Sequence, residues 1–263
     1  MKKLTAAVLA AIMPLSAQAG GWEYSVTPYL WLPSISVENS SFPTGGGSSD
    51  VGPTNYLDAL DFGFMIAGEA RNDNLVIKGD YIYLDFSVDE KDVEFDRVSG
   101  SASASLTGKV PTLMAGINVI HTDNYTMDVL AGWRRADLDL SIDATRNVIW
   151  PIFGAQPSGI RLLALDESYD DFLVGINGNL DFSDSNWSMP YYADIGAGDS
   201  DLTWQAMVGL DYAFDSWKLH LNYRHLAYDF GDLPVTVPLG GSIPIQNFEM
   251  VFSGPTIGAK FEF

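Results

Sequence analysis

The chain of 263 residues contains no cysteine and only three histidines. Without cysteine, neither a disulfide framework nor a thiolate metal site can form. His121, His220 and His225 form no i, i+4 metal pair, and no GxSxG nucleophile motif is present. The sequence therefore predicts no enzyme, no cofactor and no metal site.

Basic residues are also scarce. The chain has 14 Lys and Arg against 34 Asp and Glu, which gives a formal net charge of −20. Nucleic-acid binding depends on neutralising phosphates with Lys and Arg. A chain this acidic has no electrostatic basis for it, so we expect no nucleic-acid partner.

Long apolar runs are absent after Gly20, which excludes transmembrane helices from that part of the chain. Before it, Lys2 and Lys3 precede an apolar stretch at 4–15, and Ala17-Gln18-Ala19 is a small-x-small cleavage signal. This three-part pattern predicts a cleaved signal peptide at 1–19 and export of a mature domain at 20–263.

The remaining apolar residues alternate along the chain. In "TWQAMVGLDYAF", Trp204, Ala206, Val208 and Leu210 share one face, and the residues between them are small or polar. Side chains of a β-strand point to opposite sides with a period of two. The same pattern in other segments predicts ten strands: 22–37, 61–71, 74–88, 101–120, 124–143, 168–182, 186–198, 202–214, 216–230 and 247–263.

The connectors between these strands alternate in length. Four are tight and rich in Asn, Asp and Ser, which favour turns, whereas most of the others are long. The tight connectors are 72–74, 121–124, 183–186 and 215–216; the long ones are 39–60, 89–100, 144–167 and 231–246.

Short turns at one end and long loops at the other are typical of an outer-membrane β-barrel. We predict an all-β, transmembrane, antiparallel up-and-down barrel of about 10 strands, with 8–12 possible. The alternative is a secreted β-sandwich, whose strands usually have about five or six residues. The predicted strands have 11 or more residues, and their less apolar face carries few charges, so the barrel is favoured.

Aromatic residues near the strand ends fit the headgroup level of a membrane. Some of them are also expected simply because aromatic residues form strands well. The predicted girdle residues are Trp187, Tyr191, Trp204, Phe214, Trp217 and Tyr223.

Four segments carry a family resemblance: "VTPYLWLPSI", "MPYYADIGAGDSDLTWQAMVGLDYAF", "LNYRHLAYDF" and "GPTIGAKFEF". Together they resemble a group of uncharacterised proteobacterial outer-membrane β-barrel proteins in the OmpA-like transmembrane barrel superfamily. The resemblance implies the barrel and no particular activity. Phe261 and Phe263 are similar to the C-terminal signal that the outer-membrane assembly machinery recognises. The implied partners are this machinery, outer-membrane lipid and lipopolysaccharide.

If the apolar face meets lipid, the opposite face lines the lumen. Facing charges in a narrow barrel must be paired, which predicts a salt-bridged plug. The alternative is a narrow channel for small solutes or ions, but about eight strands are just filled by side chains and about 16 leave a channel. The predicted lumen-lining residues are Glu69, Lys78, Asp80, Asp128, Arg134, Asn177, Asn179, Asp194, Gln205, Asp211, Lys218, His220, Asn222, Arg224, Lys260 and Glu262.

The predicted outer loops are acidic at 89–96 and 166–171, which indicates solvated segments rather than a cation site. Trp150, Ile152 and Phe153 are more apolar than a solvated loop requires. They suggest contact with the barrel mouth, the outer leaflet or a partner. The sequence favours a structural or loop-mediated binding role at the cell surface. A hydrolase at the outer rim, near Asp199-Ser200-Asp201, has less support because no histidine joins those residues.

Overall fold

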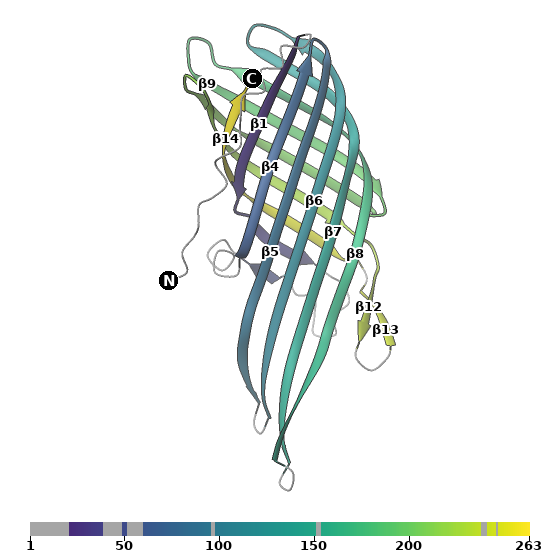
Figure 1. Cartoon of the computed structure of the whole chain (residues 1–263). Helices are drawn as coiled ribbons and strands as arrows, with labels where there is room; N and C mark the ends of the chain where they lie inside the picture. Colours follow the sequence, from purple (N-terminus) through teal and green to yellow (C-terminus); the bar gives the residue numbers. More distant parts are fainter. Residues whose placement is uncertain are drawn as a thin grey trace.

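The computed structural model of the chain describes residues 21–38, 49–51, 60–95, 98–150, 154–237, 241–245 and 247–263. In it, the segments whose apolar and polar residues alternate form long strands. Ten strands pair antiparallel in chain order, and β1 pairs with β14 to close the sheet into a barrel (Figure 1). The prediction of an up-and-down barrel of ten strands is confirmed. The wall consists of β1 (Trp22–Trp31), β4 (Leu60–Asn72), β5 (Leu75–Phe95), β6 (Val98–His121), β7 (Tyr125–Trp150), β8 (Gly154–Asp181), β9 (Trp187–Gly198), β10 (Leu202–Ala213), β11 (Lys218–Asp229) and β14 (Glu249–Glu262).

Two short strands extend the wall sheet and two others form a sheet of their own. The predicted strand 22–37 is interrupted at Leu32 and Pro33, because proline has no N–H to donate to a neighbouring strand, and the chain resumes as β2 (Ser34–Glu38). β2 also pairs with β14, and β3 (Ser49–Val51) pairs with β2. β12 (Leu233–Val237) and β13 (Gly241–Ile245) form a separate hairpin.

The four tight connectors lie together at one end of the barrel, which we call the turn end. Asp73 and Asp184 adopt positive φ values of 45° and 58° there, a conformation that Asp tolerates better than most residues. The start of β1 and the C-terminal residue Phe263 meet at the same place. The Phe263 N–H donates to the Tyr24 carbonyl at 2.9 Å, and the Tyr24 N–H donates to the Phe263 carbonyl at 3.2 Å.

At the opposite end, β5 to β8 extend well beyond the rest of the wall (Figure 1). We call this the hairpin end. The interpretation of 89–100 and 144–167 as loops is wrong, since β5 pairs with β6 as far as Phe95 and Val98, and β7 pairs with β8 as far as Trp150 and Gly154. Ile152 and Phe153, like the predicted leader 1–19, lie outside the described residues.

The two faces of the wall have inverted polarity compared with a water-soluble protein. Phe172 and Val174 point outward with 76% and 59% of their surface exposed, whereas Asp128 and Arg134 point inward with none exposed. A wide outward band of exposed aliphatic and aromatic side chains suits contact with lipid. Within the described residues, no helix is long and apolar enough to cross a bilayer.

Candidate functional site in the barrel lumen

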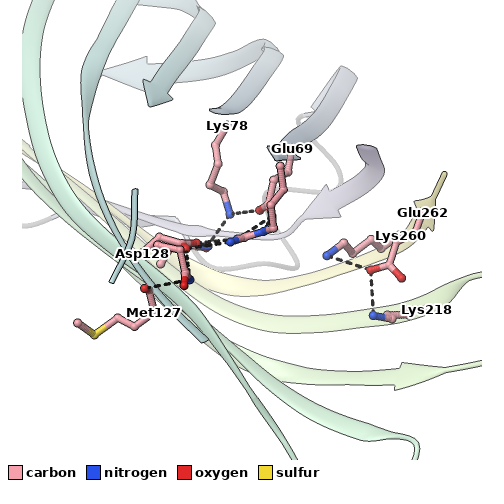
Figure 2. A network of polar contacts seen from close by, with 10 residues as sticks. Glu69, Lys78, Met127, Asp128, Lys218, Lys260 and Glu262 are labelled. Atoms are coloured by element: carbon pink, nitrogen blue, oxygen red, sulfur yellow. Dashed lines mark hydrogen bonds and ion pairs between the residues drawn. The ribbon is translucent and has the colours of Figure 1, made fainter. Parts of the chain in front are cut away.

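The lumen near the turn end is crossed by an ion cluster centred on Asp128 of β7 (Figure 2). Its carboxylate accepts two hydrogen bonds from Arg71 of β4, at 3.0 Å and 2.7 Å. Asn118 and Asn177 donate two more, at 2.8 Å and 2.9 Å. Such a buried carboxylate is stabilised only when its oxygens are satisfied, and all four bonds here come from side chains.

The same cluster continues to β5. Glu69 lies 3.1 Å from Arg71 and 3.0 Å from the Lys78 ammonium. Lys78 also donates to Asn177 at 2.6 Å, which links β5 to β8. The cluster therefore joins side chains that face each other across the lumen and pairs two cations with two carboxylates.

Two smaller groups complete the turn-end half of the lumen. Glu262 accepts from Lys218 at 2.9 Å and lies 3.3 Å from Lys260 (Figure 2). His220 Nδ1 lies 2.6 Å from Asp211 on the neighbouring strand. These five residues were predicted to line the lumen, and the structure gives each a partner there.

Farther from the turn end, two buried arginines span the lumen. Arg134 of β7 forms an ion pair with Asp194 of β9 at 2.5 Å. It also donates to Thr112 at 3.2 Å, to Thr203 at 3.4 Å and to Gln205 at 3.4 Å. The partners of this guanidinium lie on three other strands, so the side chain of Arg134 links β7 to β6, β9 and β10.

The second arginine, Arg224 of β11, is 3% exposed and bonds to three groups. It lies 2.8 Å from Asp80 of β5, donates to the Tyr29 hydroxyl at 2.8 Å and donates to Gln205 at 3.1 Å and 2.6 Å. Tyr29 in turn donates to Asp80 at 2.6 Å. Gln205 accepts from both arginines and so joins the two halves into one network, which we call the ionic belt.

The ionic belt spans the lumen with balanced charge. Arg134 and Arg224 match Asp194 and Asp80 one to one. In a medium of low dielectric constant such pairs persist only with good geometry and satisfied hydrogen bonds. Asp80 accepts from Arg224 and Tyr29, whereas Asp194 is bound to Arg134 through Oδ2 and its buried Oδ1 has no hydrogen-bond partner. The belt consists of Tyr29, Asp80, Arg134, Asp194, Gln205 and Arg224.

Beyond the belt, the wall reverses polarity. Along β7 the outward residues change from Val129 to Arg135 and Asp137, and the inward residues change from Arg134 to Leu138. The outward charges are paired, with Arg135 Nε 2.7 Å from Asp137 and Nη1 2.9 Å from Asp170. Charged side chains on the lipid face are costly, so we expect the strands to leave the membrane at the height of this reversal.

On the hairpin side of the belt, the lumen is therefore an apolar chamber. Its walls include Ile82, Leu84 and Phe86 from β5 and Ala136 and Leu138 from β7, all of them buried. About 30 Å³ between the walls is accessible to the centre of a water-sized molecule. The remaining lining residues are Trp31, Leu106, Gly108, Val110, Leu226, Tyr228, Phe230 and Phe252.

Four of the six predicted girdle residues lie near the ends of the outward face, whereas Tyr191 and Tyr223 both pair with Val208, in the middle of β10. Phe214 stacks on Trp217 at 4.5 Å between ring centres, and Trp187 packs edge-on against Tyr212 at 4.8 Å, all near the turn end. Trp204 lies toward the hairpin end. Tyr191 shares a hydrogen bond of 2.7 Å with Tyr125, and Tyr223 is exposed.

Two strand positions carry the predicted assembly signal. Phe261 is half-buried and Phe263 is exposed, beside the first strand at the closing seam. Recognition of these residues by assembly machinery stays a prediction.

Several functional side chains were missed from the sequence. Arg71 shares a strand face with Glu69 two residues before it, so the period of two could have found it. Tyr29 is amphipathic and gave no clear signal. Asp171, assigned to an acidic outer loop, is buried inside β8, where it accepts from the Ser200 N–H at 3.1 Å. The chamber was missed because all inward residues were expected to be polar.

The rim residues proposed for a hydrolase serve the β9–β10 connection. Asp199 accepts from the Asp170 N–H at 3.0 Å, and the Asp201 N–H donates to the Asp229 carbonyl at 2.9 Å. The residues that the structure describes hold no group of three or more His, Asp or Glu placed to bind a metal.

Comparison with known proteins bears on the fold. No family model matches the chain, and no curated protein matches it. The outer membrane protease OmpT from Escherichia coli aligns with a TM-score of 0.51 and 12% identity, over 93% of this chain and 98% of that one. The translocator domain of the autotransporter NalP from Neisseria meningitidis aligns with a TM-score of 0.48 and 14% identity, over 95% and 91% of the two chains. At 12% identity the likeness to OmpT is one of fold, that of an outer-membrane β-barrel protein.

Proposed function

We propose that the chain is an integral outer-membrane protein with a closed lumen, acting at the cell surface by binding or as a structural part of the envelope. The leader at 1–19 would direct export, and the turn end would face the periplasm. Outer-membrane lipid, lipopolysaccharide and the assembly machinery are its proposed partners, and membership of the OmpA-like superfamily is part of the same proposal.

The observation that carries the closed lumen is the ionic belt. Arg224 and Asp80 come from strands that are not neighbours in the wall, and their contact occupies the middle of the lumen. Both arginines are almost fully buried. Opening a water-filled path would require these charges to separate or move together, and buried pairs resist that strongly.

A narrow channel is the second candidate. Glu69 and Lys78, nearer the turn end, keep 19% and 26% of their side-chain surface exposed. Water therefore reaches this half of the lumen. A channel needs the belt to rearrange as well, which makes conduction the discriminating measurement.

The test is the conductance of the refolded mature barrel in a planar bilayer, after heat-modifiable gel mobility has shown that it is folded. The closed lumen predicts a silent bilayer despite verified insertion. Steady discrete current steps would overturn it and support the channel. The variant Lys218→Ala, at the turn-end rim and away from the belt, is the matched control and should behave as the parent does.

A further inference from the structure

We propose that the apolar chamber binds one small uncharged molecule, a single aromatic ring or a short hydrocarbon chain. The proposal deepens the proposed function and rests on it, because the belt must close the chamber on its turn-end side. The other buried apolar cluster inside the barrel, around Met114, Leu130 and Leu173, lies on the turn-end side of the belt and lines no cavity that the described residues show.

The lining chemistry defines the ligand class. None of the thirteen lining residues is charged, and five of them are aromatic. Aromatic side chains favour edge-to-face and offset contacts with another ring. A charged ligand would lose its hydration there without gaining a partner, whereas an apolar ligand would gain by leaving water.

The chamber has room that an ordinary core lacks. A Cβ added at Gly108 would meet no atom nearer than Leu138 Cδ2, at 3.9 Å. Ala136 beside it presents only a methyl group although it is 1% exposed. Well-packed cores leave few voids larger than a water molecule, and small apolar cavities stay dry and accept ligands such as benzene. Two small residues on adjacent strands therefore keep space open between large ones.

The floor of the chamber is fixed by the belt. The Arg224 guanidinium lies 4.9 Å from the centre of the Trp31 ring, and the Trp31 indole N–H donates to the Gly254 carbonyl at 3.3 Å. The Arg224 cation thus lies over the face of the indole ring, and the backbone carbonyl of Gly254 binds the N–H at its edge. A ligand would rest on a preformed aromatic surface rather than organise one.

The position of the chamber along the barrel axis determines from which side a ligand would reach it. Ala136 and Leu138 line it on the inward face of β7, at the level where Arg135 and Asp137 point outward. The chamber therefore lies in the part of the barrel that projects from the membrane. A ligand would enter from the external solution or the headgroup region rather than through the turn end.

The experiment uses fluorobenzene and the refolded mature barrel in detergent micelles, read by ¹⁹F NMR. Empty micelles give the signal of partitioned ligand, and chamber binding should add a separate or exchange-broadened signal. Gly108→Leu fills the chamber and should weaken this binding at least ten-fold. Gly79→Leu makes the same change on the lipid-facing side of β5, where a Cβ would meet only Thr112 O at 3.9 Å, and should bind as the parent does.

Folding of each variant is checked by heat-modifiable gel mobility, and Ala136→Leu provides a second filling variant should Gly108→Leu misfold. A micelle signal alone, or equal loss in Gly79→Leu and Gly108→Leu, overturns the chamber as a binding site. Bilayer recordings on the same preparations separate the two proposals. A silent bilayer without fluorobenzene binding removes only the ligand site, whereas current steps remove the closed lumen.

Discussion

Arg224 and Asp80 meet across the lumen at 2.8 Å, although β14, β1 and β4 lie between their strands in the wall. Hydrogen bonds between neighbouring strands define the circumference of the barrel but not its cross-section. A contact between distant strands does restrain the cross-section. We therefore expect the belt to contribute both to stability and to the shape of the lumen.

Removing one partner of this pair should be more harmful than removing both. Asp80→Ala leaves a buried guanidinium short of its counter-charge, which should lower the free energy of unfolding by about 3 kcal/mol. The double variant Asp80→Leu/Arg224→Met should recover most of that loss. Urea unfolding in lipid vesicles measures both, with Lys218→Ala as a half-exposed pair that should cost less than about 1 kcal/mol. Equal losses in the single and double variants would contradict the buried-pair interpretation.

The polarity reversal on the outward face predicts that substitution by arginine is costly on one side of the reversal and nearly neutral on the other. Val174→Arg in β8 places a charge in the lipid-facing band and should cost about 2–4 kcal/mol. Asp166→Arg lies on the same face of the same strand beyond the reversal, and should change the unfolding free energy by less than about 0.5 kcal/mol. The fraction of folded protein after insertion into vesicles reports both. If Asp166→Arg is the more damaging change, the proposed membrane boundary is misplaced.

Close approach of strands predicts a strong requirement for glycine at one position. A Cβ at Gly132 would lie 2.2 Å from Leu113 O and 2.7 Å from Met114 Cα, so Gly132→Ala must displace backbone. We expect a loss of about 1–3 kcal/mol. Gly79→Ala, on a nearby strand with open space around its Cβ, is the control and should fold normally. Thermal unfolding followed by gel mobility distinguishes them, and identical midpoints would be evidence against the tight packing at Gly132.

The projecting part of β7 should show a pH dependence. Partial burial raises the pKa of Asp137, but hydrogen bonds from Ser168 and Arg135 outweigh it and hold that pKa below its usual value. A carboxyl with a lowered pKa stabilises the fold above its unfolded pKa of about 3.9 and loses this effect as the pH falls through the folded value.

The matched variant is Asp137→Asn. Amides of β7 near residue 137 should exchange with solvent more slowly in the parent than in the variant at pH 6. Once corrected for intrinsic exchange, this difference should disappear as the pH falls through the lowered pKa of Asp137 in the folded protein. A difference that persists unchanged in acid would mean that the Asp137 charge contributes nothing.

The alternation in the sequence was enough to predict ten strands, the tight turns and which side of each strand faces inward. A period of two assigns a side chain to a face, as for Asp128 and Arg134. It gives neither the partner across the lumen nor the height in the membrane. Those depend on strand tilt and stagger, which local pattern does not encode.

The hairpin extensions were harder to predict for a related reason. In "RRADLDLS" of β7, the apolar residues Ala136 and Leu138 occupy the inward face, and outward Arg135 and Asp137 are charged. The strand continues, but the face that carries the apolar residues changes. A rule that expects apolar residues outward throughout interprets this change as the end of the strand, and so it placed loops where β7 and β8 continue.

The closing seam joins residues from opposite ends of the described chain, such as Val26 with Phe261. The other neighbouring wall strands follow one another in the sequence and can pair soon after synthesis. One edge of β1, in contrast, stays unpaired until β14 has been made. Until then both strands present unpaired N–H and C=O groups, the state that invites pairing with other chains. Contacts this distant in sequence form slowly. The seam is therefore the slowest and most aggregation-prone step expected in assembly, and protection of β1 during that interval would govern the yield of folded barrel.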